Sequence, residues 1–252
     1  MTGFSSARIL VTGAASGIGA ATARLLGERG ARLVLMDRDA ERLRDLPEAT
    51  HIIGDVADPA LWTEADLTGL THAVINAGIG AGGPIEDMSF DEWRRVMAVN
   101  LDGAFLSLQA AMRAIRATGA TGQEGGGAIV VTASAAGFKP EPGIGAYAAS
   151  KAAVIQLARV AAREGAAARI RVNAIAPGGV ETPIWSTQPF FQELVAAHGG
   201  EEGAYRAIAG IGTPLGRFAK PAEIAAQIAF LLSDDAAFTT GACLVTDGGY
   251  SL

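Results

Sequence analysis

Two ionisable side chains in the segment GAYAASKAAV have a spacing that allows them to work together. Tyr147 and Lys151 are four residues apart, and residues at this spacing share one face of a helix. A free tyrosine has a pKa near ~10, and a nearby cation lowers this pKa by stabilising the phenolate. The pair therefore indicates either a proton-transfer unit or a tyrosine that anchors a core beside a lysine in solvent.

Two polar residues upstream have the chemistry to complete such a unit. Ser134 lies before Tyr147 at the end of an expected strand, where doubly wound folds place their sites. Its hydroxyl can donate to a substrate oxygen, although a serine at a strand end also commonly satisfies backbone groups. Asn100, in a long expected helix, either bends that helix and holds a water through which Lys151 exchanges protons, or has a structural role only.

A glycine-rich turn near the N-terminus predicts a nucleotide site. The segment TGAASGIG contains Gly13, Gly17 and Gly19, directly after one expected strand and before a helix that begins near Ile18. Glycine permits a tight turn and lets backbone amides approach a pyrophosphate at the positive end of the helix. The triplet alone is weak evidence, but its place in a strand–helix–strand unit strengthens it.

An acidic residue after the second expected strand suggests which nucleotide is bound. Asp37 lies eighteen residues after Gly19, close to the spacing at which a carboxylate meets the adenosine ribose hydroxyls. A carboxylate there repels a 2′-phosphate, so NAD is expected rather than NADP. Arg38 is the residue that could accept that phosphate if it turned inward, and Asp37 could also cap a helix that starts near Ala40.

Short aliphatic runs alternate with segments of helical periodicity along the whole chain. The runs have strand length and are apolar on both faces, which is typical of a parallel sheet covered by helices on both sides. Seven runs predict one doubly wound α/β domain that spans residues 1–252 without a linker. The expected strands begin near Arg8, Arg32, Thr50, His72, Ala128, Arg169 and Ala242, and the clearest helices cover Ile18–Arg29, Phe90–Ala117, Ala146–Ala168 and Pro221–Leu232.

Two stretches interrupt this alternation. Residues 117–128 are rich in glycine and predict a mobile surface loop. Residues 182–220, which we call the excursion, lie between the sixth and seventh strands and contain Trp185, Phe190, Phe191 and Tyr205. At the C-terminal edge of a parallel sheet such a segment is either a lid or substrate wall, or a packed helical insertion.

The composition excludes several classes of protein. The net charge is −6 and no Lys/Arg-rich run occurs, which argues against nucleic acid or an anionic membrane as the main partner. Cys243 is the only cysteine and the three histidines (His51, His72 and His198) are scattered, so no disulfide or metal site is expected. With no leader-like N-terminus and no apolar run of ~18 residues, we expect a soluble cytoplasmic protein.

The motifs also occur in an order that resembles a known family. That order is TGAASGIG, NAG at Asn76, Asn100 in VNLDG, Ser134 in TASAAG, Tyr147 and Lys151 in YAASK, PGGVET from Pro177, and TGACLVTDGG near the end. Each motif is weak singly, but together and in order they are highly specific. The sequence is therefore similar to the short-chain dehydrogenases/reductases of about this length.

The resemblance implies a Rossmann fold, a nicotinamide cofactor and a catalytic set of Asn100, Ser134, Tyr147 and Lys151. It implies that residues 55–56 border the adenine, that residues 76–78 line the cofactor, and that residues 180 and 182 hold the nicotinamide carboxamide. It also implies a homo-oligomer, a tetramer rather than a dimer, built on the two long helices. The expected cofactor contacts are Gly13, Ser16, Gly17, Ile18, Gly19, Asp37, Arg38, Asp55, Val56, Asn76, Ala77, Gly78, Tyr147, Lys151, Pro177, Gly178, Val180 and Thr182.

Two departures from the family pattern are visible. Ile75 stands where relatives commonly have a second asparagine before Asn76, which puts one side-chain contact in question but leaves the backbone turn intact. The stretch from Asp55 to Asn76 is short, so the third helix is expected to be a stub.

The substrate is less well determined than the reaction. The segment AAGFKPEPGIG and the aromatic excursion predict a mainly apolar pocket, and hence a medium-sized, cyclic or aromatic alcohol or ketone. The expected substrate contacts are Ser134, Ala136, Phe138, Ile144, Tyr147 and Trp185. Lys139, His198 or Arg217 could instead meet the carboxylate of a small hydroxy acid.

Two other functions stay open at this stage. A 3-oxoacyl-carrier-protein reductase would normally favour NADPH and present a basic docking surface, and neither is evident. A nicotinamide-binding redox sensor without turnover belongs to a different class, and the presence of Ser134, Tyr147 and Lys151 together argues against it.

Overall fold

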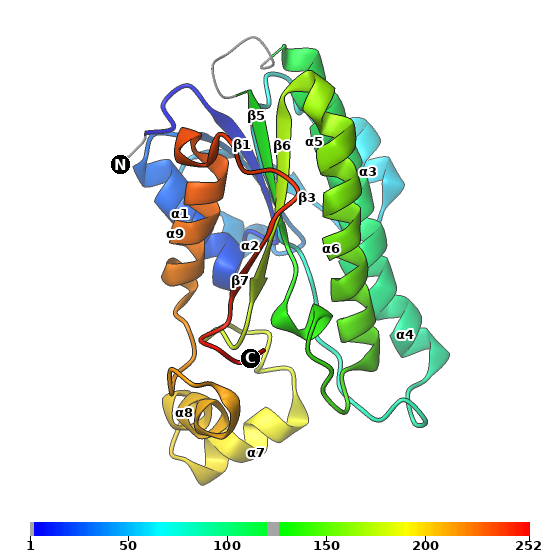
Figure 1. Ribbon diagram of the computed structural model, residues 1–252, viewed down its shortest axis with the longest axis vertical. Helices are drawn as coiled ribbons and strands as arrows, with labels where there is room; N and C mark the ends of the chain where they lie inside the picture. Colours follow the sequence, from blue (N-terminus) through cyan, green and yellow to red (C-terminus); the bar gives the residue numbers. More distant parts are fainter. Residues whose placement is uncertain (1–2, 120–125) are drawn as a thin grey trace.

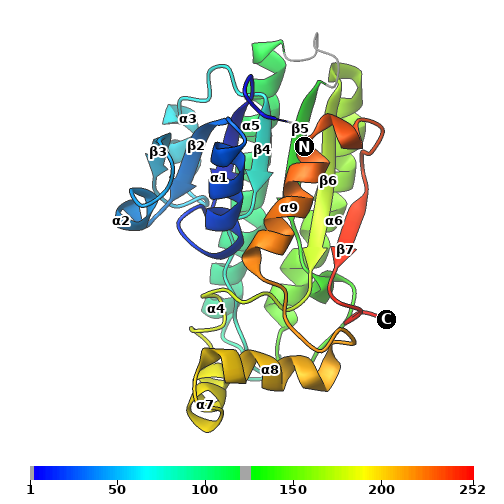
Figure 2. The ribbon, with the colours of Figure 1, turned by 90° about the vertical axis from the view of Figure 1, so that its left-hand side faces the viewer.

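Seven parallel strands form one sheet in the order β3-β2-β1-β4-β5-β6-β7 (Figures 1 and 2). The computed structural model describes residues 3–119 and 126–252, so residues 120–125 of the expected surface loop lie outside the described residues. All seven expected strands are present, each beginning within one residue of its expected position. The strands are β1 Arg8–Thr12, β2 Arg32–Asp37, β3 Ala49–Ile53, β4 His72–Ile75, β5 Gly127–Thr132, β6 Ile170–Pro177 and β7 Cys243–Thr246.

Helices cover both faces of this sheet. On one face α1 packs against α9, and on the other α4 and α5 follow each other along α6 (Figures 1 and 2). The short third helix is the expected stub. The helices are α1 Gly17–Glu28, α2 Ala40–Leu43, α3 Pro59–Glu64, α4 Phe90–Met97, α5 Gly103–Thr118, α6 Gly145–Gly165, α7 Pro189–Ala197, α8 Glu201–Gly212 and α9 Pro221–Leu232.

The strand order creates the crevice that a doubly wound sheet offers to a ligand. Strands β1 and β4 are neighbours, and the chain runs outward from β1 to β3 before it crosses to β4. The connections that leave β1 and β4 therefore turn to opposite sides of the sheet, and the space between them is the usual binding position. The glycine turn follows β1, and Asn76 follows β4, so both expected nucleotide motifs border this crevice.

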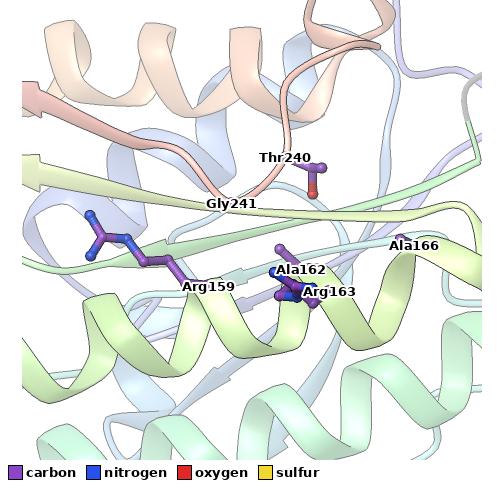
Figure 3. Close-up of a pocket in the computed structure, with 6 residues that line it drawn as sticks. All are labelled: Arg159, Ala162, Arg163, Ala166, Thr240 and Gly241. Atoms are coloured by element: carbon purple, nitrogen blue, oxygen red, sulfur yellow. The ribbon is translucent and has the colours of Figure 1, made fainter.

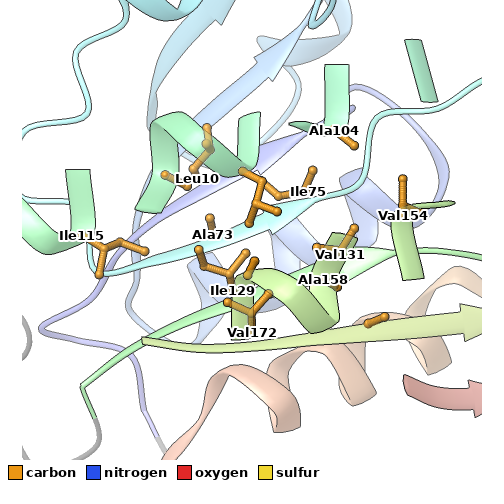
Figure 4. Close-up of a cluster of buried hydrophobic side chains, with 14 of the residues drawn as sticks. Leu10, Ala73, Ile75, Ala104, Ile115, Ile129, Val131, Val154, Ala158 and Val172 are labelled. Atoms are coloured by element: carbon orange, nitrogen blue, oxygen red, sulfur yellow. The ribbon is translucent and has the colours of Figure 1, made fainter. Parts of the chain in front are cut away.

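The core consists of two apolar layers, one on each face of the sheet. Strand residues alternate between the two layers because successive side chains point to opposite faces. The layer under α5 and α6 includes Leu10, Ala73, Ile75, Ala104, Ile115, Ile129, Val131, Val154, Ala158 and Val172, all buried (Figure 4). The small residues of α6, such as Ala158, let this helix lie close to β5 and β6.

The long helix expected over Phe90–Ala117 is interrupted in one place. Its α4 and α5 parts are joined by a π-helical turn, Ala98–Asp102, with Asn100 at its centre. Such a turn has i→i+5 hydrogen bonds and one extra residue, and it is often found at functional sites. The prediction of one continuous helix was therefore wrong at this turn, although Asn100 does distort the helix locally as expected.

The excursion is a packed pair of helices with a core of its own. Helices α7 and α8 lie beyond the C-terminal edge of the sheet, at the bottom of Figure 1. Phe191 is fully buried there, its ring 5.0 Å from that of Tyr205, and the ring of Trp185 lies 5.2 Å from that of Phe218. Of the two alternatives for the excursion, the packed helical insertion is therefore the one that describes its architecture. In the described part of the chain, no helix combines the length and hydropathy that a membrane crossing requires.

Candidate active site

The glycine turn after β1 is packed so tightly that its glycine positions have no room for a side chain. A Cβ atom at Gly19 would lie 2.0 Å from the carbonyl oxygen of Gly13, and one at Gly13 would lie 2.8 Å from Cα of Ala77. Gly13 and Gly17 have φ values of +65° and +52°, which favour glycine. The turn leads directly into α1, with Ser16 as its N-cap and Ile18 in its first turn. Free backbone amides and the helix dipole make this place suitable for a pyrophosphate.

The crevice is braced from the other side by the segment after β4. The hydroxyl of Thr12 accepts hydrogen bonds from the backbone amides of Asn76 and Ala77, at 2.9 and 3.1 Å. The side-chain amide of Asn76 donates to the carbonyl oxygens of Thr12 and Gly13. Asn76 therefore holds the glycine turn in place despite the unusual Ile75 before it. Thr12 is a supporting residue that the sequence interpretation missed, and its only sequence signal is a polar residue at a buried strand end.

Asp37 lies at the end of β2, where the expected adenosine ribose would be. Its carboxylate accepts hydrogen bonds from the backbone amides of Ala15, at 2.9 Å, and Asp39, at 3.1 Å. Two bonds leave acceptor capacity for ribose hydroxyls. The suggestion that Asp37 caps the next helix was wrong: Asp39 is the cap of α2, and its side chain accepts from the amide of Arg42. Asp37 is too early in the chain for that role because Ala40 begins the helix.

The residues expected around the adenine lie on the same side of the crevice. Arg38 forms an exposed ion pair with Asp55 at 3.8 Å. Val56 is buried, and a Cβ atom at Gly103 would come within 2.6 Å of its side chain, so it packs against the start of α5. Together with the glycine turn and Asp37, these residues form a cradle that fits a dinucleotide.

Tyr147 and Lys151 share one face of the first turns of α6; Lys151 is buried, and Tyr147 is half-buried. Nζ of Lys151 lies 5.7 Å from the centre of the Tyr147 ring and donates to the carbonyl oxygen of Thr132 at 2.9 Å. Burial lowers the pKa of Lys151 to about 8, so the ammonium remains mostly protonated at neutral pH. The alternative of a lysine in solvent is excluded, because only 4% of Lys151 is exposed.

The phenol itself has an environment that the sequence interpretation did not anticipate. Burial raises the pKa of Tyr147, and a hydrogen bond with Ser134 lowers it in part. Burial is the larger effect because it removes water from around a phenolate. The pKa therefore lies above its ordinary value, where the sequence had predicted a lowered one. The hydroxyl of Ser134 also accepts a hydrogen bond from the amide of Ala136 at 3.2 Å, which fixes its direction.

Asn100 connects the π-helical turn to the catalytic helix. Its side-chain oxygen accepts from the amide of Ile79 at 2.8 Å, and its side-chain nitrogen donates to the carbonyl of Ile79 and to Oγ of Ser150. The Ser150 hydroxyl in turn donates to the carbonyl oxygen of Tyr147 at 2.7 Å. This chain of bonds fixes the loop after β4 against the turn of α6 that carries Tyr147. Ser150 is a second supporting residue that was missed, although it stands inside YAASK.

The segment after β6 passes from the cofactor turn to the excursion. Pro177 ends β6, and Gly178 follows it against Asp247, which lies within 2.8 Å of a Cβ built on this glycine. Val180 and Thr182 are buried, and a Cβ at Gly17 would lie 3.0 Å from the side chain of Thr182. The structure thus places this segment beside the glycine turn, as its expected cofactor role requires.

The expected substrate contacts divide into two groups. Ala136, Phe138 and Ile144 belong to the loop between β5 and α6, and Phe138 is 46% exposed. Trp185 is packed in the aromatic core of the excursion, and its indole nitrogen donates to the carbonyl of Val180 at 2.9 Å. Its position as a substrate contact stays a prediction. These contacts do not bear on metal binding, so the expectation of no metal site also stays a prediction.

The first turn of the excursion reaches across to the loop after β4. Cβ atoms built on Gly80 and Gly82 would each lie 3.1 Å from the side-chain amide of Gln188, and Gly80 also faces Ile184. The amide of Gly83 donates to the carbonyl of Gly143 at 2.8 Å. The loop after β4 therefore contacts both the first turn of the excursion and the loop before α6. Gln188 was not expected at this position, because only the tertiary fold brings it there.

A separate pocket of about 350 Å³ lies away from these residues (Figure 3). It is on the side of α6 that faces the start of β7, and it includes none of the expected site residues. Its lining residues are Arg159, Ala162, Arg163, Ala166, Thr240 and Gly241.

Comparison with known proteins assigns the family. The profile of the family described as Enoyl-(Acyl carrier protein) reductase matches residues 13–251. A short-chain type dehydrogenase/reductase from Mycobacterium marinum has a solved structure that superposes with a TM-score of 0.86 at 32% identity, covering 99% of this chain and 97% of its own. The chain belongs to the short-chain dehydrogenase/reductase family.

Two characterised relatives match over nearly their whole length. Cis-4-hydroxycyclohexanecarboxylate dehydrogenase of Sinomonas cyclohexanicum is 39% identical, over 96% of this chain and 95% of its own. Cyclohexanol dehydrogenase of Acinetobacter sp. (strain SE19) is 36% identical, over 98% of this chain and 96% of its own. As a short-chain dehydrogenase, this chain acts on CH–OH groups and uses a nicotinamide nucleotide.

Proposed function

We propose that this short-chain dehydrogenase interconverts an uncharged cyclic secondary alcohol and its ketone with NAD. The observation that carries the proposal is the meeting of Ser134, Tyr147 and Lys151 beside the glycine crevice. Oxidation of an alcohol requires a base for the hydroxyl proton and an acceptor for the hydride. The chain provides the base, and oxidised nicotinamide, when bound, would supply the hydride acceptor together with a positive charge.

Each of the three side chains has one task in this scheme. Ser134 donates to the substrate oxygen and holds it beside the phenol. Tyr147 takes the hydroxyl proton during oxidation and returns it during reduction, which requires a phenolate at neutral pH. Because burial raises the pKa of Tyr147, nearby positive charge has to offset that rise, and the buried Lys151 ammonium is placed to contribute. Asn100 positions the helix, and its expected role in proton exchange remains a prediction.

The preference for NAD is supported by the charges at the ribose end. Asp37 presents a carboxylate there, and the amides of Ala15 and Asp39 hold it in place. Arg38, the residue that could have met a 2′-phosphate, is paired with Asp55. A 2′-phosphate would therefore meet a fixed negative charge and an arginine that already has a partner. This arrangement favours the nucleotide without that phosphate.

The preference for an uncharged substrate is supported by the partners of two cations. Lys139 lies 3.4 Å from a carboxylate oxygen of Glu141, and Arg217 binds both carboxylate oxygens of Glu223 at 2.7 Å. Each was a candidate partner for a substrate carboxylate, and each is already paired. The relatives include both a cyclohexanol and a hydroxycyclohexanecarboxylate dehydrogenase, and this pairing favours a substrate of the first kind.

One panel of reactions tests the proposal. Cyclohexanol and cis-4-hydroxycyclohexanecarboxylate, each with NAD and with NADP, would be compared through the rate of reduced-nicotinamide formation. The expected result is the highest kcat/KM with cyclohexanol and NAD. A higher kcat/KM with the carboxylate would overturn the preference for an uncharged substrate. A higher kcat/KM with NADP would overturn the preference for NAD. Acetoacetyl-carrier protein with NADPH tests the 3-oxoacyl reductase alternative, and absence of turnover with every alcohol and ketone would favour a redox sensor.

We also infer a homo-oligomer, a tetramer rather than a dimer, formed through α4–α5 and α6. The support is the apolar surface of these helices, where Phe105 is 45% exposed and Val160 is 44% exposed. Light scattering coupled to size-exclusion chromatography gives the mass directly. A monomeric mass at micromolar concentration would contradict this inference.

A further inference from the structure

The last turn of the described chain lies between the loop that follows Ser134 and the end of the excursion. We call residues Asp247–Ser251 the Tyr250 turn. In Figures 1 and 2 the end of the chain is found between the lower end of β7 and helix α8. The carboxylate of Asp247 accepts from the amides of Gly249 and Ser251, at 2.9 and 2.8 Å. The turn therefore has a defined shape before it contacts anything else.

On one side, the Tyr250 turn is joined to the loop that follows Ser134. The phenol of Tyr250 donates to a carboxylate oxygen of Glu141 at 2.8 Å. Nζ of Lys139 donates to the carbonyl oxygen of Tyr250 at 2.9 Å and lies 4.0 Å from the centre of its ring. Lys139 and Glu141 are themselves paired, so each of the three side chains contacts the other two. The contacts include a charge-assisted hydrogen bond and a cation–π contact.

The phenol of Tyr250 remains a donor under all ordinary conditions. Burial raises its pKa, and the hydrogen bond to Glu141 raises it further. At neutral pH the phenol therefore keeps the proton that it donates to Glu141.

On its other sides, the Tyr250 turn meets the excursion and the cofactor segment. The carbonyl oxygen of Gly248 accepts from the amide of Leu215 at 3.1 Å. A Cβ atom at Gly212, the last residue of α8, would lie 3.8 Å from the Tyr250 ring, and one at Gly178 would lie 2.8 Å from Cα of Asp247. Three segments that border the site therefore converge on this one turn.

Behind the turn, Gly248 lies against Leu215, and Gly249 lies against Pro214. A cavity of about 470 Å³ lies there, and its lining includes Asp247, Gly248, Gly249, Leu215 and Leu252. Leu215 is 71% exposed. The polar contacts of Tyr250 are the ones that join this turn to the loop after Ser134.

We propose that Tyr250 is a positioning residue for the substrate, which acts by fixing the loop after Ser134 against the end of the excursion through Glu141 and Lys139. It touches neither the reacting atoms nor the cofactor cradle. Its loss widens the substrate half of the cleft and weakens substrate binding, while proton transfer at Tyr147 continues. The kinetic test of this inference rests on the proposed function. The structural test, by hydrogen exchange, does not.

The kinetic test uses Tyr250→Phe in the full-length enzyme with cyclohexanol and NAD. This variant keeps the ring over Lys139 and removes only the hydroxyl. Loss of a hydrogen bond to a charged group predicts a rise of about tenfold in KM for the alcohol, with kcat within about twofold and NADH affinity unchanged. An unchanged KM, or an equal loss of kcat and NADH affinity, would overturn the proposal.

Matched variants separate positioning from general damage. Ser251→Ala alters the same turn, but the bond from its backbone amide to Asp247 is retained, so all constants should stay at the wild-type values. Glu141→Ala should reproduce the effect of Tyr250→Phe, whereas Glu141→Gln keeps an oxygen that can accept from the phenol and should restore most of the affinity. The double variant Tyr250→Phe/Glu141→Ala should be no worse than either single variant, because both remove one contact. Additive losses would contradict the assigned pair.

Amide hydrogen exchange tests the same idea without any substrate. Peptides covering residues 135–145 should exchange faster in Tyr250→Phe than in the wild type or in Ser251→Ala, while peptides covering β1 and α1 should not change. Identical exchange in residues 135–145 would refute the inference. If the wild type oxidises no cyclic alcohol, the proposed function fails, and the exchange experiment still decides the role of Tyr250.

Discussion

The two halves of the cleft are held together by different kinds of contact. In the cofactor half, which comprises the ends of β1, β2 and β4, side chains at the strand ends bind backbone groups, and glycines of the turn lie against other backbone atoms. Gly19 lies directly against Gly13, and Thr12 binds two successive amides after β4. Each of these contacts involves residues next to a strand of the central sheet, and the sheet fixes them.

The substrate half, formed by residues 135–145, the excursion and the Tyr250 turn, lies beyond the edge of the sheet. Its contacts are between side chains that are far apart in sequence, such as Tyr250 with Glu141 and Phe191 with Tyr205. The excursion also has an aromatic core separate from the two main layers. The comparison leads us to expect that the cofactor half tolerates a change of shape less well than the substrate half, although Trp185 and Tyr205 of the excursion bind Val180 and Thr182 beside the cofactor turn.

Removal of the phenol between the two halves should have the largest effect. Tyr147→Phe deletes the proton donor and acceptor, and general acid–base catalysis of this kind contributes on the order of 10³-fold. We expect kcat to fall by about that factor while NADH binding, followed by its fluorescence, stays within about twofold. Retention of ordinary turnover would exclude Tyr147 as the acid and base.

A methyl group in the cofactor half should have the next largest effect. Gly19→Ala places a Cβ atom 2.0 Å from the carbonyl oxygen of Gly13, so the turn has to move. We expect NADH affinity to fall about a hundredfold and the free energy of unfolding to fall by about 1–3 kcal/mol. Fluorescence titration and urea denaturation measure the two effects.

The matched substitution in the substrate half is Gly210→Ala in α8. A Cβ atom at Gly210 meets nothing within 4 Å, and alanine favours a helix over glycine by up to about 1 kcal/mol. NADH affinity should therefore be unchanged and stability equal or slightly higher. Similar losses in both variants would show that the loss in Gly19→Ala does not come from its close contact with Gly13.

Damage to the aromatic core should affect the substrate half alone. Phe191 is fully buried, and replacing a buried phenylalanine with alanine typically costs about 3–5 kcal/mol. Because this core is separate, we expect Phe191→Ala to raise the KM for the alcohol by about tenfold or more, with little change in NADH affinity. Phe190→Ala is the control, since its side chain is 47% exposed. Loss of NADH binding in Phe191→Ala would show that the halves are coupled.

Among the changes expected to impair function, a change of charge at the ribose end should have the smallest effect. Asp37→Ala removes the carboxylate that repels a 2′-phosphate and accepts from ribose hydroxyls. We expect the ratio of kcat/KM for NAD to that for NADP to fall by about tenfold, the size of one charged hydrogen bond. Asp37→Asn keeps an acceptor and should give an intermediate ratio. An unchanged ratio would remove Asp37 from cofactor selection.

The same division explains what the sequence could predict. The strands, the glycine turn and the face shared by Tyr147 and Lys151 depend on neighbours within a few residues, and patterns of that length are legible in one sequence. The family resemblance extended the prediction of site residues to Asn100 and Ser134. The ion pair of Arg38 with Asp55, and the triangle of Lys139, Glu141 and Tyr250, join distant segments. No local pattern distinguishes such residues from ordinary surface charges.

Two errors of the sequence interpretation have the same physical origin. The helix over Phe90–Ala117 was expected to be regular because its periodicity is regular; the interruption follows from bonds between Asn100 and Ile79. The pKa of Tyr147 was expected to fall because of Lys151, and burial by the surrounding fold raises it. In both cases a tertiary contact outweighs the local preference.

The π-helical turn has a further consequence for how the length of this chain can vary. Because the widened turn takes up one extra residue, α4 and α5 keep the faces that a continuous α-helix would give them. Removing one residue from Ala98–Asp102 would leave a regular helix on the same side of the sheet, but it would remove the widened turn from which Asn100 binds both Ile79 and Ser150. A deletion of one residue here should therefore act like the loss of Asn100, even if that side chain is retained.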